Sequence, residues 1–128
     1  MKNLGQEKNN LTKFFKSFKY CYDGIKYAIF NEQNIMVEII LGITAITLGL
    51  ILKVNITEMI IIILLCAVVI ALEIVNTAIE RVVDLVTKEQ TELAKIAKDC
   101  ASGAVGIVAI AAFIIGIIIF VPKLLALF

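Results

Sequence analysis

The sequence predicts an all-α membrane protein, in which an N-terminal amphipathic surface helix is followed by three transmembrane helices. Two observations support this fold class. First, 61% of the 128 residues are hydrophobic and the mean hydropathy is +1.00, a more apolar composition than soluble domains have. Second, most apolar residues fall into three runs long enough to cross a bilayer as helices. We expect one integral-membrane domain over residues 1–128.

Residues 1–30 predict a polar tail and then the surface helix. We expect residues 1–9 to be disordered, Asn9 or Asn10 to cap the helix, and Gly24 to interrupt it. Beyond the cap, apolar side chains recur every three or four residues, as on one helix face, and lysines lie on the other faces. Such a helix suits a membrane interface, and packing on a soluble core is the alternative. The apolar face consists of Leu11, Phe15, Phe18, Tyr22, Ile25 and Ile29.

Three apolar runs follow this helix, and we expect them to cross the membrane at residues 35–52, 59–79 and 100–121. The first run contains a single charged residue, Glu38, and the third contains none. We expect Pro122 to end the third helix, because proline cannot continue a helix without losing a backbone hydrogen bond.

Polar segments separate the three runs. Residues 31–34 predict a break or a tight bend, and residues 53–58 predict a short turn in which Thr57 is a plausible helix cap. We expect the helix of the second run to continue past the bilayer to Val86. Residues 87–98 then form a polar connection, which we expect to have short helical character.

The positions of the basic residues predict an orientation. Ten of the twelve Lys and Arg residues precede the first run or lie between the second and the third. Because short cytoplasmic loops carry an excess of Lys and Arg, we expect the N-terminus and the 84–99 loop to face the cytoplasm. The two basic residues on the other side are Lys53 and Lys123.

The residue types restrict the possible chemistry. The chain has no His, so a Cys–His catalytic pair is excluded, and its three Cys are too far apart for a zinc site, so we expect reduced thiols. Neither a P-loop nor the protein-kinase motifs are present. Any ATP site must therefore be built from side chains at the membrane surface. The net charge of +1 is uninformative, and we expect no nucleic acid partner.

A polar stripe lies at the end of the second run. Glu73, Asn76, Glu80 and Asp84 follow at spacings of three, four and four residues, which places them on one helix face. Because an unpaired charge is costly in apolar surroundings, these groups need a ligand or partners. Carboxylate and amide oxygens suit Mg²⁺, and phosphoryl transfer uses such a metal together with a base. Two alternatives remain open, namely ion pairs with Lys or Arg between packed helices and an intramembrane ion or proton pathway in a non-enzymatic protein.

The same stretch resembles a family signature. Residues 73–84, which read E-I-V-N-T-A-I-E-R-V-V-D, match the pattern E-x-x-N-[ST]-A-x-E-x-x-x-D of the small bacterial lipid kinases, a family that comprises prokaryotic diacylglycerol kinase and undecaprenol kinase. Residues 98–105 resemble the second block of this family. The N-terminal part is similar at residues 18–20, 24–25 and 31–32, and the similarity extends from about residue 13 to 120.

The resemblance implies a homotrimer whose active sites are shared between neighbouring subunits at the cytoplasmic boundary of a bacterial cytoplasmic (inner) membrane. It implies transfer of the γ-phosphoryl group of Mg²⁺-ATP to the hydroxyl of diacylglycerol or undecaprenol. By matching position, Glu73 would be the catalytic base, and the metal ligands would be Glu32 and Glu80. The implied lipid contacts are Glu38, Glu73 and Ser102. The implied nucleotide contacts are Lys13, Tyr20, Asn76, Glu80, Lys98 and Asp99.

Several positions depart from the family pattern. Glu38 stands where undecaprenol kinases tend to have His, and Glu92 also agrees with the diacylglycerol type. The usual E-Y-H is replaced by Glu89-Gln90-Thr91, whereas residues 93–99 resemble the undecaprenol type. Lys13 replaces what is commonly Arg, so a bidentate phosphate contact is lost. The lipid acceptor therefore stays open between the two.

Overall fold

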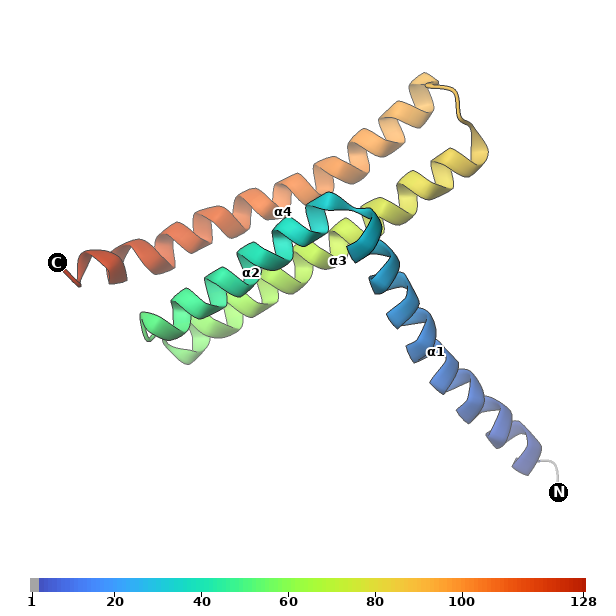
Figure 1. Ribbon diagram of the computed structural model, residues 1–128, viewed down its shortest axis with the longest axis horizontal. Helices are drawn as coiled ribbons and strands as arrows, with labels where there is room; N and C mark the ends of the chain where they lie inside the picture. The colour runs from blue at the N-terminus through green and yellow to red at the C-terminus, as the bar shows by residue number, and fades with distance from the viewer. Residues whose placement is uncertain (1–2) are drawn as a thin grey trace.

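The computed structural model describes residues 3–128, with side chains from Asn9 onward, and shows a three-helix bundle with one projecting arm (Figure 1). The described residues form helices and connections without any strand, which confirms the predicted all-α class. The four helices are α1 (Asn3–Asn31), α2 (Gln33–Ile51), α3 (Ile56–Val86) and α4 (Glu92–Leu125).

Helix α3 is the centre of the bundle, because both α2 and α4 pack against it (Figure 1). The end of α3 and the beginning of α4 extend past the start of α2 as a hairpin. Helix α1 contacts α2 and α3 near their junction and then points away from them as an arm. The α1–α2 break therefore lies beside α3, and the α3–α4 hairpin continues beyond it (Figure 1).

Helices α2, α3 and α4 are each long and apolar enough to cross a membrane. Few of their large apolar side chains are buried in the bundle. Ile107, Phe113 and Ile118, for example, are 65% or more exposed. A bilayer, and not a protein core, is the environment that covers such surfaces, so the chain is a membrane protein.

The N-terminal helix is longer and more regular than expected. It is already helical at Asn3, so the prediction of a disordered tail capped at Asn9 or Asn10 is wrong for the described part of that tail. The predicted interruption at Gly24 is also wrong, because α1 continues through it. Residues 6–8 are good helix formers, and a single exposed glycine costs a long helix only about 1 kcal/mol.

The break between α1 and α2 is confirmed. Glu32 has an extended backbone (φ −117°, ψ 117°) and is the residue that separates the two helices. The most buried apolar side chains of the described residues flank it, Ala28 at 1% and Ile35 at 0% exposure. These two residues anchor both sides of the break, so the position of Glu32 relative to α3 is fixed.

The turn between α2 and α3 is confirmed, but its cap is Asn55 and not Thr57. The Asn55 side chain accepts a hydrogen bond from the backbone of Glu58, and the Glu58 carboxylate accepts one from the backbone of Asn55, both at 2.9 Å. This reciprocal capping box satisfies two backbone donors that Thr57 cannot reach together. Lys123 of α4 also pairs with Glu58 at 3.0 Å and ties the two helices together.

Helix α4 exceeds its predicted bounds at both ends. It begins at Glu92, capped by the Thr91 hydroxyl, so the polar connection is restricted to residues 87–91 and the short helical character expected there belongs to α4 itself. It continues past Pro122 to Leu125, against the expectation that proline ends it. Near the end of a helix, proline removes only one backbone hydrogen bond, and the helix tolerates this loss.

Candidate active site

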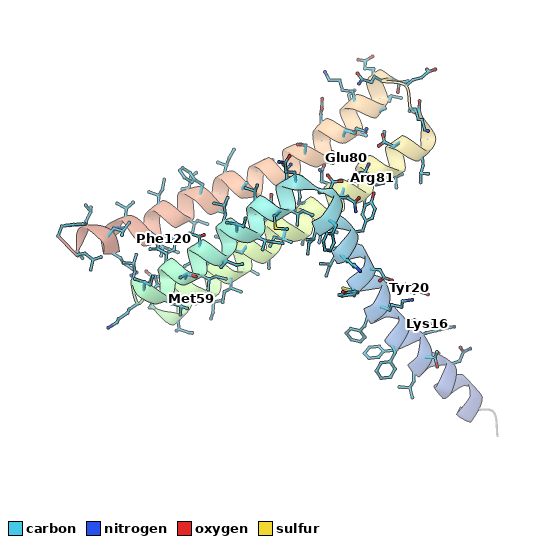
Figure 2. All side chains as sticks on the ribbon, in the orientation of Figure 1. Lys16, Tyr20, Met59, Glu80, Arg81 and Phe120 are labelled. Atoms are coloured by element: carbon cyan, nitrogen blue, oxygen red, sulfur yellow. The ribbon has the colours of Figure 1, made fainter. Side chains whose placement is uncertain are left out.

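Polar side chains gather along the part of α3 that lies near the α1–α2 break (Figure 2). Figure 2 shows Glu80 and Arg81 where α1 joins the bundle, whereas Met59 and Phe120 lie at the opposite end. The buried polar side chains of the described residues are Glu73, Asn76 and Thr77, with exposures of 4%, 8% and 4%. Buried polar groups normally have hydrogen-bond partners. A polar atom of these side chains that has no partner is therefore available to a ligand.

Among the described residues, no cation pairs with the Glu73 carboxylate. Thr77 donates its hydroxyl hydrogen bond to the Glu73 backbone carbonyl at 3.0 Å, so it does not engage the carboxylate. Glu38 of α2, another acid, is close enough to Glu73 to be affected by its charge. The Glu38 Oε2 atom is buried and has no hydrogen-bond partner within the described residues. Two acidic groups from adjacent helices therefore lie together in apolar surroundings without compensation.

The next residue of the polar stripe is also incompletely satisfied. Asn76 Nδ2 donates a long hydrogen bond of 3.5 Å to Glu80 Oε1. Its Oδ1 is buried and accepts no hydrogen bond from the part of the chain that the structure describes. An amide oxygen in this state is available to a metal ion or to a ligand that carries a donor.

Ion pairs are restricted to the outer part of the site. Arg81 Nη2 lies 2.6 Å from Glu32 Oε1, and Lys98 Nζ lies 2.6 Å from Asp84 Oδ1. Arg81 Nη1 is also 3.9 Å from Asp84 Oδ2. The hydrogen bond from Lys98 lowers the pKa of the Asp84 carboxyl below its ordinary value. One of the open alternatives was that the acidic side chains form ion pairs with Lys or Arg between packed helices. Such pairs account for Glu32 and Asp84, but none of the described residues forms one with Glu73.

The available oxygens suit a magnesium ion that is bound partly by water and substrate phosphates. They do not suit a metal that is bound by protein ligands alone. Among the described residues, no three His, Cys, Asp or Glu side chains converge closely enough to hold a metal. Mg²⁺ usually takes one or two carboxylates and completes its shell with water and substrate phosphates. The Glu80 and Glu32 carboxylates and the unpartnered Asn76 amide oxygen supply ligands of this type.

Two cavities border the polar residues. A polar pocket of about 280 Å³ lies at the α3–α4 hairpin, and its lining includes Asp84, Lys98 and Asp99. A larger apolar cavity of about 430 Å³ is lined by side chains of α2, α3 and α4, and Glu38 is the only acidic residue of its lining. The site therefore lies between a polar pocket and an apolar one.

The remaining predicted site residues lie apart from α3. Tyr20 lies on the exposed arm α1, away from the bundle (Figure 2). Lys13 lies two turns further toward the N-terminus of α1 and is also exposed. Ser102 lies on an exposed face of α4. Within one chain, Tyr20 and Lys13 do not join the polar stripe (Figure 2).

One residue of the site was missed in the sequence. Arg81 was counted only for orientation, yet it pairs with Glu32 and approaches Asp84. It is the only arginine of the chain and the only cation between residues 73 and 84. A single cation within an acidic stripe is a signal that could have identified it.

A profile of the family described as prokaryotic diacylglycerol kinase matches residues 19–120 of the chain. The chain belongs to this family. The match includes the α1–α2 break, the whole of α3 and most of α4. Membership in the prokaryotic diacylglycerol kinase family makes the chain a membrane-embedded lipid kinase, as the resemblance of residues 73–84 implied.

Individual family members are similar over most of the chain. Undecaprenol kinase of Bacillus subtilis is 41% identical over 117 residues, which cover 91% of this chain and 95% of that protein. Diacylglycerol kinase of Synechocystis is 41% identical over 127 residues, which cover 98% of this chain and 71% of that protein. Diacylglycerol kinase of Escherichia coli is 32% identical over 111 residues, which cover 87% and 91% of the two chains.

Proposed function

We propose that the protein transfers the γ-phosphoryl group of Mg²⁺-ATP to the hydroxyl of a membrane lipid, either diacylglycerol or undecaprenol. The observation that carries this proposal is the buried Glu73 carboxylate, with which no cation of the described residues pairs. Glu73 lies seven residues before Glu80, or about 10 Å along the helix axis. A base at this depth is suited to an alcohol that cannot leave the bilayer.

In the proposed reaction, Glu73 accepts the proton of the lipid hydroxyl as the hydroxyl oxygen attacks the γ-phosphorus of ATP. A new oxygen–phosphorus bond forms, the bond between the γ-phosphorus and the β,γ-bridging oxygen breaks, and ADP leaves. Glu73 is 4% exposed, and this burial favours the lipid hydroxyl over water as the acceptor.

Glu32, Glu80 and the Asn76 amide oxygen would hold the magnesium ion. When bound, Mg²⁺ neutralises charge on the phosphate oxygens. We place the nucleotide in the polar pocket at the α3–α4 hairpin, where Lys98 and Asp99 are available to it. Lys98 would exchange its hydrogen bond with Asp84 for a contact with phosphate.

The lipid tail would occupy the apolar cavity of about 430 Å³. Glu38 is part of its lining and interacts electrostatically with Glu73, so a lipid in this cavity has its polar end near the base. Glu38 and Ser102 are the further side chains that we assign to lipid contact.

We also propose a homotrimer with shared active sites. Tyr20 and Lys13 lie on the arm α1, away from the α3 of their own chain (Figure 2). In a trimer, they would contribute to the active site of a neighbouring subunit. Each chain would form one domain over residues 1–128 in a bacterial cytoplasmic (inner) membrane. Its spans would be residues 35–52, 59–79 and 100–121, with the N-terminus and the 84–99 loop in the cytoplasm.

The test is transfer of labelled phosphate from γ-labelled ATP in mixed micelles that contain diacylglycerol and a long-chain polyprenol side by side. The proposal predicts a labelled lipid that depends on Mg²⁺, and the more strongly labelled product identifies the acceptor. No labelled lipid, together with cation or proton flux in liposomes that depends on Glu38 and Glu73, would favour the ion-pathway alternative instead.

A further inference from the structure

Arg81 has three partners that lie on different segments. Its guanidinium is 2.6 Å from Glu32 at the α1–α2 break and 3.9 Å from Asp84 one turn further along α3. It also lies over the ring of Tyr27 of α1, 5.9 Å from the ring centroid. The only arginine of the chain therefore connects the arm, the break and the central helix.

The backbone around Glu32 is held independently of Arg81. The Glu32 amide donates a hydrogen bond of 2.9 Å to the Ala28 carbonyl, and the Asn31 side chain donates one of 2.7 Å to the Tyr27 carbonyl. Ala28 and Ile35 are almost fully buried on either side. Backbone packing thus fixes where Glu32 stands, whereas the direction of its carboxylate depends on Arg81.

The contact with Arg81 uses only one carboxylate oxygen of Glu32. Arg81 Nη2 donates to Oε1 at 2.6 Å, and the described residues contribute no hydrogen bond to Oε2. A carboxylate held in this way keeps its charge and presents its second oxygen in one orientation. Carboxylates that bind metals are commonly oriented by such an outer hydrogen bond, and the loss of that bond weakens metal binding.

We propose that Arg81 is a positioning residue for the kinase reaction, which holds Glu32 so that its free oxygen is directed at magnesium. This proposal rests on the proposed function, in which Glu32 is a metal ligand. The same guanidinium is also 3.9 Å from Asp84, whose other oxygen accepts a hydrogen bond of 2.6 Å from Lys98, the lysine that the proposed function assigns to the nucleotide. Arg81 thus stands between the carboxylate assigned to the metal and the ion pair assigned to the nucleotide.

The exposure of the pair argues for positioning and against a mainly structural role. The Arg81 and Glu32 side chains are 47% and 20% exposed. An ion pair this accessible to solvent contributes little to stability, so its removal is expected to leave the fold intact. Its effect should appear in the binding of metal.

The test compares Arg81→Ala and Arg81→Lys with the wild-type protein in two measurements. The first is Mn²⁺ binding, followed by electron paramagnetic resonance in the presence of a non-hydrolysable ATP analogue. The second is the Mg²⁺ dependence of lipid phosphorylation. Arg81→Ala should raise the metal concentration for half-saturation about 10- to 100-fold in both measurements, and change the rate at saturating Mg²⁺ much less. Arg81→Lys should recover part of the loss, because it keeps the charge but not the planar fork.

The matched control is Lys123→Ala, which removes the 3.0 Å pair with Glu58 at the other end of α3 and should change neither measurement. A double variant, Arg81→Ala with Glu32→Gln, should bind Mn²⁺ no more weakly than Glu32→Gln alone, because both changes remove the same ligand orientation.

Unchanged or tighter Mn²⁺ binding by Arg81→Ala would overturn the positioning role, and so would strictly additive effects in the double variant. Either result leaves the proposed function standing as long as the wild-type protein binds Mn²⁺ and phosphorylates lipid. Absence of both activities in the wild-type protein would overturn the proposed function and the role of Arg81 together.

Discussion

The two ends of α3 use their polar side chains differently. At the N-terminal end, Asn55 and Glu58 exchange two hydrogen bonds in a capping box, and Glu58 also pairs with Lys123. In the C-terminal half of α3, Glu73 is buried and Asn76 has a buried oxygen, and among the described residues Glu73 pairs with no cation and the Asn76 oxygen has no partner. The first end is complete within one chain, whereas the second has polar atoms that require a ligand or a neighbouring subunit.

We infer from this difference that one part of α3 contributes mainly to the stability of the fold and the other mainly to lipid phosphorylation. Substitutions at the capping end should change stability and leave lipid phosphorylation unchanged. Substitutions at the end that carries Glu73 and Asn76 should affect phosphorylation more than stability. The following variants test the comparison, in order of decreasing effect.

The largest effect is expected for Glu73→Gln. Loss of the base should lower kcat for lipid phosphorylation about 10²- to 10⁴-fold and leave nucleotide affinity unchanged. The control is Glu58→Gln, which makes the same chemical change at the other end and keeps the capping box, since glutamine also serves there. The measurements are steady-state kinetics and nucleotide binding for both variants. Comparable values of kcat in the two variants would show that Glu73 is not the base.

A smaller effect is expected for Glu80→Gln. It should raise the Mg²⁺ concentration for half-maximal rate about 10- to 100-fold, because a neutral amide is a weaker ligand for a hard cation. The measurement is a titration of the initial rate against Mg²⁺ at fixed free ATP. An unaltered midpoint would assign Glu80 to a role other than metal binding.

Asn55, which caps α3, and Asn76 within it offer a matched pair with opposite outcomes. Asn55→Ala should destabilise the protein by about 1 kcal/mol through loss of the cap and leave phosphorylation unchanged. Asn76→Leu removes a buried oxygen that has no partner, so it should be neutral or stabilising by up to about 1 kcal/mol, and it should weaken nucleotide binding. Thermal unfolding in detergent and a nucleotide titration measure the two effects. A destabilised Asn76→Leu that still binds nucleotide normally would reverse the interpretation.

The smallest effect concerns Asp84, which Lys98 holds in the charged form. Because the pKa of Asp84 is lowered in the folded protein, this pair contributes to stability at neutral pH, and the contribution is lost as the pH falls through that lowered pKa. Lys98→Met should return the pKa of Asp84 toward its ordinary value. A ¹³C NMR titration of labelled aspartate carboxyls measures this change, and an Asp84 pKa that stays low would show that Lys98 is not the cause.

The bundle could be predicted from the sequence because its causes are local. Three apolar runs of sufficient length specify α2, α3 and α4, and the spacing from Glu73 to Asp84 specifies one helix face. The capping box of Asn55 and Glu58 was also readable, but Thr57 was taken for the cap.

The contacts that organise the site could not be predicted in the same way. Glu32 and Arg81 are 49 residues apart in sequence, and they meet only because Ala28 and Ile35 anchor the α1–α2 break against the bundle. The hydrogen bond between Lys98 and Asp84 depends on the length of the connection, which is residues 87–91 in the structure, whereas the polar composition predicts residues 87–98. Both contacts depend on tertiary packing, which cannot be predicted from the local sequence pattern.

The central claim is that nucleotide and metal bind at the end of α3 that carries Glu73 and Asn76. Pulsed electron paramagnetic resonance can measure the distance from Mn²⁺, bound with a non-hydrolysable ATP analogue, to a nitroxide at either end of the bundle. The labels are placed at Leu93→Cys or Lys53→Cys after replacement of the three native cysteines. Since α3 has 31 residues and is therefore about 45 Å long, the account predicts a short distance from position 93 and a distance tens of ångströms longer from position 53. The reverse order would contradict it.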